Sequence, residues 1–291
     1  MSQSAPQIGP AGVPRDAYPL VRLSAEFFLR SVDLLTQIQG NKLISGLVFI
    51  AVWHNHMRAP AAGPVGVREL ARRLNLPYET VRRHAMELVK AGQCTATREG
   101  LDIVPAVLTS RANIELLRRF HNNTERMLID MTRAGLAGYE TPPKAGSRRA
   151  GLSPHQMAIV VASIRQLLAG IRMLGDLWNG DVLRGLVFTA IWTANVKHVI
   201  NTPQAAIQDV LPDEHRRAVS VLAISNSLRL PYETVRRHAA ALEKDGICQR
   251  IGRQGVVIPT SAHRKLPTGT IQAHGMLVNL LSELRSAGLK V

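Results

Sequence analysis

The chain of 291 residues contains the same nine-residue segment twice, and this repeat constrains the fold more than any other feature. Residues 77–85 read PYETVRRHA, and residues 231–239 read PYETVRRHA again. At roughly one chance in twenty of a match per position, nine consecutive identities exclude coincidence. Shorter matches flank the segment, with 185–188 repeating 46–49 and 287–289 repeating 134–136. The chain therefore contains an internal duplication, which has to be recognised before the fold is interpreted.

The duplication divides the chain into four parts. We predict a loose tail over 1–20, a first repeat over 21–137, a linker over 138–153 and a second repeat over 154–291. Pro, Gly and Ser are frequent in the tail and the linker, which is typical of segments outside a packed core. The second repeat is longer than the first upstream of the shared segment, and the polar stretch 201–217 accounts for the extra residues.

Hydrophobic periodicity and turn residues predict the same order of elements in both repeats. In the first repeat we expect helices over 27–38, 42–57, 67–74, 77–91 and 111–133, with strands over 94–97 and 101–104 before the last helix. Asn75-Leu76-Pro77 separates the third and fourth helices, and Gly92 ends the fourth. In the second repeat, 155–174 and 183–199 correspond to the first two helices. The predicted fold is mainly α-helical with small β-wings.

Two short helices joined by a tight turn and followed by a hairpin are typical of a winged helix-turn-helix. The chain resembles the DNA-binding domains of MarR-type and GntR-type bacterial transcription regulators in Leu70-Ala71, Thr80-Val81-Arg82, Leu88 and Gly92. Helices on both sides of the winged unit are closer to the MarR arrangement, in which outer helices form the dimer. The resemblance implies two tandem winged helix-turn-helix domains, each flanked by long helices, with double-stranded DNA as partner and a homo-oligomer formed through the flanking helices as an option. Those families usually carry one winged unit per chain, so their operator layout does not carry over.

The charge of the chain favours a polyanionic partner. Lys and Arg number 36 against 21 Asp and Glu, a net charge of +15, and the excess is similar in both repeats. Arginine supplies 29 of the 36 cations. Its planar guanidinium suits phosphate groups and guanine edges, although a genome biased towards Arg codons explains the ratio equally well.

A helical wheel of the segment 77–91 places Val81, Ala85 and Leu88 inward, with Tyr78 and Val89 beside them. Glu79, Thr80 and Arg83 point outward, and Arg82 lies on the shoulder. Arg83 can bind guanine, Glu79 can accept a hydrogen bond from cytosine or hold Arg83, and Thr80 and Arg82 suit phosphates. A solvated Glu-Arg pair is the alternative. That alternative predicts that outward residues diverge between repeats, whereas all of them recur.

We therefore predict DNA contacts for the shared outward set and its surroundings. The shared set is Tyr78, Glu79, Thr80, Arg82 and Arg83, with Tyr232, Glu233, Thr234, Arg236 and Arg237. The short helix before it adds Arg68, Arg72 and Arg73, where the second repeat has Leu222, Asn226 and Ser227. The predicted wing tips carry Arg98 in the first repeat, and Arg250 and Arg253 in the second. We expect two half-sites with common core bases and unequal flanking contacts.

Other polar and aromatic residues suggest weaker interpretations. Cys94 and Cys248 begin the two wings, where buried packing is the better interpretation than a redox or metal pair. His54 and His56 are two residues apart on one helix, a poor spacing for a metal site, and His84 and His238 lie beside the inward face of their helices. Trp53 and Trp192 could line the pocket of a small-molecule effector, with core packing as the simpler interpretation.

Several function classes lack support in the sequence. Glycine-rich nucleotide loops, HExxH, GxSxG and paired catalytic carboxylates are absent, so we expect no enzyme activity, cofactor or metal. The longest apolar run, 47–53, is too short for a membrane span, and the N-terminus does not read as a secretory signal. We expect a soluble protein, and the resemblance implies a bacterial, cytoplasmic and nucleoid-associated one.

The predicted function is sequence-specific DNA binding in transcription regulation, with the two winged domains acting as an intrachain pseudo-dimer. Two alternatives stay open. The first is a plasmid replication initiator, which also uses tandem winged domains. The second is an interaction scaffold, because winged domains also bind proteins.

Overall fold

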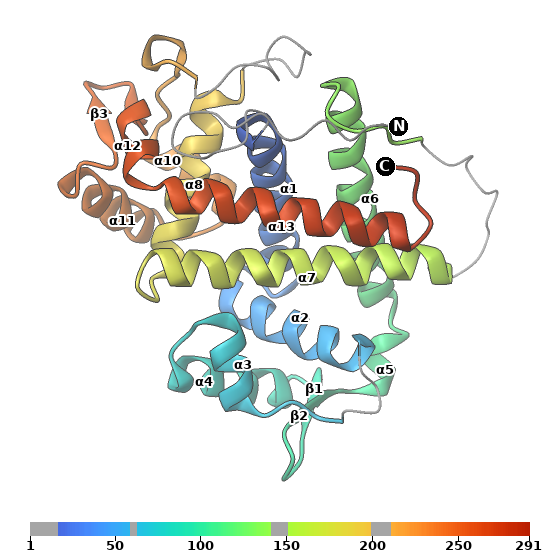
Figure 1. The fold of residues 1–291 in the computed structure, drawn as a ribbon. Coiled ribbons are helices and arrows are strands. Elements are labelled where there is room, and N and C mark those ends of the chain that lie inside the picture. Colours follow the sequence, from blue (N-terminus) through green and yellow to red (C-terminus); the bar gives the residue numbers. More distant parts are fainter. Residues whose placement is uncertain (1–16, 59–62, 141–150, 199–210) are drawn as a thin grey trace.

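The structure is a computed structural model that describes residues 17–58, 63–140, 151–198 and 211–291. It is mainly helical with two small antiparallel sheets (Figure 1), as predicted. The first half contains α1 (Ala17–Ile38), α2 (Leu43–Arg58), α3 (Val67–Leu74), α4 (Tyr78–Lys90), β1 (Cys94–Ala96), β2 (Leu101–Ile103), α5 (Pro105–Leu108) and α6 (Arg111–Arg133). The second half contains α7 (Pro154–Leu177), α8 (Val182–Val196), η3 (Asp213–His215), α10 (Val221–Leu228), α11 (Tyr232–Lys244), β3 (Gln249–Ile251), β4 (Gly255–Val257), α12 (Thr260–Lys265) and α13 (Pro267–Ser286).

Most helices lie within a few residues of their predicted bounds, and α3 and α6 match them fully. The exception is α1, which begins at Ala17 instead of residue 27, so the predicted tail is wrong for 17–20. Leu20, Leu23 and Phe27 form an apolar strip that is buried in the core, and Pro19 is tolerated because it lies in the first turn. The rest of the predicted tail, 1–16, lies outside the described residues.

The predicted linker and insertion fall only partly on described residues, since 141–150 and 199–210 lie outside them. The described flanks are ordered. Tyr139 is buried and its hydroxyl donates to Glu125 Oε1 at 3.1 Å. On the other side Ser153 begins α7 through a capping box with Gln156. Tyr139 is thus bonded to α6 and Ser153 caps α7, so the linker is shorter than the predicted 138–153.

The turn between the two short helices has the same backbone in both halves. α3 ends at Asn75 and α10 at Arg229, both left-handed with φ of 51° and 52°. Pro77 and Pro231 then precede α4 and α11, where a missing N–H costs nothing. We call α3, α4, β1 and β2 the first unit, and α10, α11, β3 and β4 the second unit.

Each hairpin is extended by one more bridge. Val65 pairs with Leu101 in the first unit, and Val219 pairs with Val256 in the second. Gly100 precedes the first bridge at φ 148°, and a Cβ there would lie 2.5 Å from the Val65 carbonyl. Glycine is needed at this place because only it permits both the backbone angle and the close approach.

Four long helices, α1, α6, α7 and α13, pack on one another between the two units, and α7 and α13 run side by side (Figure 1). The first helix of each half contacts the unit of the other half. Asn75 Nδ2, after α3, donates to Asp176 Oδ1 of α7 at 2.8 Å, while Arg229 Nε, after α10, donates to Asp33 Oδ1 of α1 at 2.6 Å. Each unit is thus supported by the first helix of the other half.

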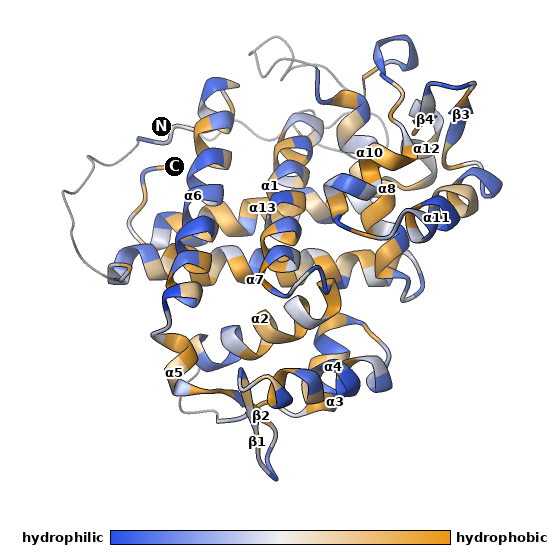
Figure 2. Ribbon diagram, turned by 180° about the vertical axis from the view of Figure 1, so that it is seen from behind, coloured by the Kyte–Doolittle hydropathy of each residue, from blue (hydrophilic) through white to orange (hydrophobic). Residues whose placement is uncertain are grey.

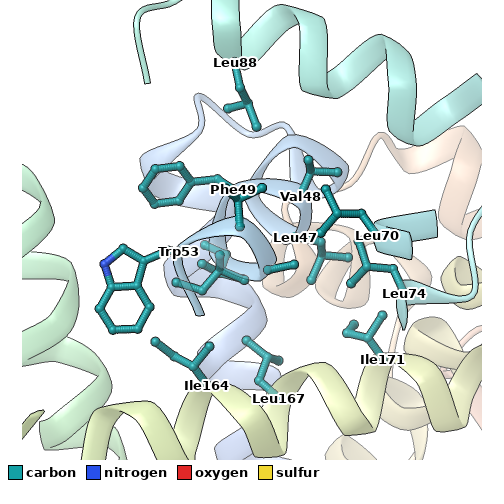
Figure 3. Packing of buried hydrophobic residues seen from close by; sticks show 14 of the residues in the cluster. Leu47, Val48, Phe49, Trp53, Leu70, Leu74, Leu88, Ile164, Leu167 and Ile171 are labelled. Carbon is teal, nitrogen blue, oxygen red and sulfur yellow. The ribbon is translucent and has the colours of Figure 1, made fainter. Parts of the chain in front are cut away.

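The hydrophobic cores follow this crossing. In the first unit, Ile164 and Leu167 of α7 pack beneath Leu47 and Trp53 of α2 (Figure 3). In the second unit, Val21 and Ala25 of α1 join the core formed by α8, α10 and α11. The predicted boundaries 21–137 and 154–291 therefore describe the order of the chain, but each core uses residues from both repeats.

α7 is long and apolar enough by composition to cross a membrane, and it is the one such helix within the described ranges. Half of its apolar window is buried inside the protein, against α2, α6 and α13. This packing accounts for part of its apolar character.

Candidate nucleic-acid interface

α4 and α11 present the same outward surface. Val81, Ala85 and Leu88 are buried in the first unit, and Val235, Ala239 and Leu242 take the same places in the second. Opposite them Glu79, Arg82 and Arg83 are exposed and Thr80 is half-buried, and their counterparts in α11 have the same burial. Both helices lie towards the right-hand side of the molecule in Figure 2, with hydrophilic outer surfaces.

One ion pair is repeated on both helices. Arg82 Nε donates to Glu79 Oε2 at 2.8 Å, and Arg236 Nε donates to Glu233 Oε2 at the same distance. This hydrogen bond raises the pKa of Arg82 and Arg236. Of the two roles predicted for Glu79, holding Arg83 is wrong, and accepting a hydrogen bond from cytosine stays a prediction. On this surface the Glu lies three residues before its partner and orients the shoulder arginine instead.

The central arginine of each surface is left available. Within the described residues, Arg83 and Arg237 are exposed and form no hydrogen bond or ion pair. A shallow hollow beside Arg83 is lined by Glu79, Thr80, Arg82, Met86, Glu87 and Lys90. Two free guanidinium groups at equivalent places are suited to bidentate hydrogen bonding with an external acceptor.

Met86 and Lys90 extend this surface towards the end of α4, and the sequence interpretation missed them. Met86 is 40% exposed, and Lys90 is exposed as well. The same wheel could have found Met86, because five positions after Val81 a helical residue points away from the buried face. Ala240 and Lys244 hold these places in α11.

Tyr78 was placed beside the inward face, and this is wrong. It is the first residue of α4, where the chain leaves the turn, and it is 41% exposed; Tyr232 is 45% exposed. The guanidinium of Arg68 lies 5.8 Å from the centre of the Tyr78 ring, a cation–π contact. Exposure brings Tyr78 onto the outward surface that the sequence predicted for DNA contact.

The arginines of α3 are partly engaged within the protein. Arg72 Nε donates to Glu69 Oε2 at 2.8 Å, and Arg73 Nε donates to Glu69 Oε1 at 2.7 Å. Arg73 also donates to Asn55 Oδ1 of α2 at 3.0 Å. These bonds lower the pKa of Glu69. A phosphate would have to compete with the Glu69 carboxylate for the guanidinium groups of Arg72 and Arg73. Arg68, the third arginine of α3, does not bond to Glu69.

The corresponding surface of α10 has no arginine. Leu222 is 56% exposed where α3 carries Arg68, and Asn226 and Ser227 replace Arg72 and Arg73. The difference in charge that the sequence showed is therefore a difference between exposed surfaces.

The hairpin arginines are placed differently from one another. Arg98 is exposed at the tip between β1 and β2, and Arg253 is exposed at the tip between β3 and β4. Arg250 was predicted at this tip and instead lies within β3, where its Nη2 is 3.5 Å from Glu243 Oε2 of α11. β3 extends to Ile251, so Arg250 lies inside the strand and the tip begins after it.

Different groups hold the two outward helices on their supports. Ser45 Oγ of α2 lies 2.8 Å from His84 Nδ1, and Lys42 Nζ donates to Glu87 at 3.1 Å. Burial lowers the pKa of His84, which favours the neutral ring. The interpretation of His84 as a packing residue agrees with this contact.

α11 is held on α8 by a larger group of charged contacts. Asp181 Oδ2 lies 3.4 Å from His238 Nδ1, and burial lowers the pKa of His238. Arg184 binds the Asp245 carboxylate, donates to the Ala241 carbonyl at 3.2 Å and stacks on Trp178 at 5.1 Å. The same outward surface is thus carried by two different supports.

Comparison of the chain with protein-family models, with curated proteins and with solved structures finds no match. The geometry of the surface on α4 and α11 therefore carries the functional argument by itself.

The remaining residues singled out in the sequence have structural roles. Cys94 and Cys248 are free and buried, as predicted. Burial raises the pKa of the Cys94 thiol to about 12 and that of Cys248 to about 11. His56 Nδ1 lies 2.9 Å from Asp102, and His54 is buried. Groups of three or more His, Cys, Asp or Glu able to hold a metal ion do not occur among the described residues.

Proposed function

We propose that the protein binds double-stranded DNA sequence-specifically as a transcription regulator, with two winged helix-turn-helix units in one chain. The observation that carries the proposal is the repeated surface of α4 and α11. The same exposed Glu-Arg pair, at the same 2.8 Å, stands beside a free Arg83 or Arg237 in each unit. A structural role would not require the same exposed side chains in the same bonding state twice.

The chemistry of this surface suits the major groove of DNA. A free guanidinium on a recognition helix binds the O6 and N7 acceptors of guanine, and each good bidentate contact contributes about 1–3 kcal/mol of discrimination. Arg82 and Arg236, kept in place by their carboxylates, suit the flanking phosphates. Exposed Arg98 and Arg253 at the hairpin tips add charge where a wing meets the backbone.

A single chain carries both reading surfaces, so it can act as a pseudo-dimer. α1, α6, α7 and α13 pack on one another within the chain, which is the role that outer helices play between subunits in a dimer. Two recognition helices on one side of a duplex would contact major-groove segments about one turn, or roughly 34 Å, apart. Assembly into a homo-oligomer and a place on the bacterial nucleoid remain parts of the proposal.

In vitro selection of bound DNA, followed by single arginine variants, tests the proposal. We expect selection to yield two related half-sites, and Arg83→Ala and Arg237→Ala each to weaken binding by about 5- to 150-fold, as loss of one bidentate contact predicts. Arg119→Ala is the matched control, because Arg119 is an exposed arginine on α6 that already pairs with Glu115. Unchanged binding by both Arg83→Ala and Arg237→Ala would rule the proposal out.

Salt dependence and site arrangement separate the alternatives. Each phosphate contact contributes about −0.9 to the slope of log affinity against log salt. A steep slope without sequence preference would indicate charge alone, and weak non-specific association would favour the interaction scaffold. Repeated copies of the selected site beside a replication origin would favour the plasmid initiator.

A further inference from the structure

The second half contains an apolar cavity of about 110 Å³ between α1, α7, α8 and α13. Aromatic side chains form much of its wall, among them Phe28, Trp178, Phe188 and Trp192. Among the described residues that line it, none is Asp, Glu, Lys or Arg. Both tryptophans are buried in cores, which was the simpler interpretation of the sequence, and Trp192 also lines this cavity, whereas Trp53 is 1% exposed in a filled core.

The cavity exists because the second half lacks side chains that fill the equivalent place in the first. The Ala-Gly-Leu after α6 recurs after α13, which aligns Leu116, Leu117 and Phe120 with Gly269, Thr270 and Ala273. The three residues of α6 are at most 2% exposed and belong to the first core. Their smaller counterparts on α13 line the cavity.

α1, on the other side of the cavity, also carries a smaller side chain than its counterpart α7 does. Leu35 packs against Gly46 in the first half and Leu174 against Gly185 in the second, which aligns α1 with α7. In this alignment Ala25 corresponds to Ile164, which packs near Trp53 in Figure 3. At the filled site Leu116, Leu117, Phe120 and Ile164 thus stand where the hollow site has the smaller Gly269, Thr270, Ala273 and Ala25.

Three polar side chains are part of the cavity wall. Gln166, Ser24 and Thr270 line the cavity, and each is 8% exposed. Their side chains form no hydrogen bond with the described residues, whereas the equivalent of Ser24, Ser163, bonds Thr124 at 2.6 Å. These groups can therefore form a hydrogen bond with a ligand that carries a complementary group.

We propose that this cavity binds a neutral, single-ring aromatic compound that carries a hydroxyl or carbonyl group. Its volume is comparable to the engineered apolar cavity of about 150 Å³ that takes up benzene in another protein. The aromatic wall favours a ring, and the Gln166 amide with the two hydroxyls supplies the polar contact. An ionised ligand is disfavoured because the described lining residues offer no charged side chain to compensate for its desolvation.

The cavity adjoins the support of one recognition helix only. Trp178 lines it and stacks on Arg184, which in turn bonds Asp245 and Ala241 at the end of α11. Control of DNA binding by the ligand would rest on the proposed function as well. Binding of the ligand does not, and it can be measured without DNA.

Fluorine NMR of the full chain with small probes tests the proposal. 4-Fluorophenol should show saturable line broadening, fluorobenzene weaker binding, and 4-fluorobenzoate none. Ala273→Phe and Thr270→Leu copy residues from the first half, and each should reduce 4-fluorophenol binding at least tenfold while circular dichroism shows an unchanged helix content. Trp53→Phe, at the equivalent place in the filled core, is the matched control and should bind as the wild type does.

Gln166→Leu tests the polar contact separately. It should remove the preference for 4-fluorophenol over fluorobenzene while fluorobenzene still binds. The proposal is overturned if neither neutral probe binds the wild-type chain, if 4-fluorobenzoate binds as well as 4-fluorophenol, or if both folded filling variants retain full binding. The wild-type titrations decide the first two outcomes even if a filling variant fails to fold.

Discussion

The packing sites around Trp53 and Trp192 occupy equivalent places in the two halves, yet one is filled and the other is hollow. Phe120 fills the first site where the second has Ala273. Meanwhile the exposed Glu79, Arg82 and Arg83 of α4 recur unchanged in α11. A duplicated chain that was constrained only to fold would keep its interior and change its surface. Here this part of the interior has changed and the outward residues have not. Different constraints have therefore acted on the interior and on this surface.

The largest expected effect concerns the filled site. Phe120→Ala should lower the free energy of unfolding by about 3–5 kcal/mol, because it removes a fully buried ring and leaves a cavity. The reciprocal Ala273→Phe should cost little, since space for the ring exists. Chemical denaturation of both variants measures the difference, and equal losses would show that the two sites are packed alike.

Acid should weaken the first half through His54. Burial lowers the pKa of His54 to about 4, and the second half has Thr193 at the equivalent place. The unfolded chain therefore takes up a proton near pH 6.5 while the folded chain does not. Stability is complete above pH 6.5 and falls by about 3 kcal/mol as the pH approaches 4. Denaturation at several pH values should show a smaller fall for His54→Thr, and identical profiles would contradict this role.

Exchange of one residue between α3 and α10 should alter the salt dependence of DNA binding, if the proposed function holds. Arg68→Leu should make the log-log salt slope about 0.9 less steep, and Leu222→Arg should make it steeper by a similar amount. Affinities measured at several salt concentrations decide this. A slope that does not respond to either change would place both side chains away from phosphates.

The smallest difference is expected at the two cysteines. The Cys94 thiol has a pKa of about 12 and the Cys248 thiol one of about 11, so both are almost fully protonated at pH 8. Reaction with a disulfide reagent should be slow at both, and faster at Cys248 because more of it is thiolate. Cys94→Ser and Cys248→Ser isolate the two rates, and urea-unfolded chains provide the reference. Faster reaction at Cys94 would reverse the expected order.

Local features of the fold were predictable from the sequence, because they depend on residues close together in the chain. Asn75-Leu76-Pro77 marked the turn, and the apolar spacing of Val81, Ala85 and Leu88 identified the buried side of α4. The outward arginines followed from the same periodicity. Tyr78 did not, since a first-turn residue is directed by the preceding turn as well as by the helical wheel.

Long-range packing was not predictable in this way. α2 is apolar on nearly every side, so its sequence predicts burial without saying which helix covers it. That α7 supplies the cover depends on residues over a hundred positions away, and so does the cavity between Ala25 and Ala273. The spacing of residues allowed Glu79 to pair with either Arg82 or Arg83. Which of them it bonds depends on side-chain directions that the sequence does not give.

The crossing of α1 and α7 has a consequence for synthesis of the protein. A chain grows from its N-terminus, and α2 emerges well before α7, whose Ile164 and Leu167 cover it. Until then the apolar side of the first unit faces water, where it is exposed to aggregation and to chaperones. Neither half can complete its core by itself during translation, so the outward surfaces of α4 and α11 become stable together, when the second half has left the ribosome.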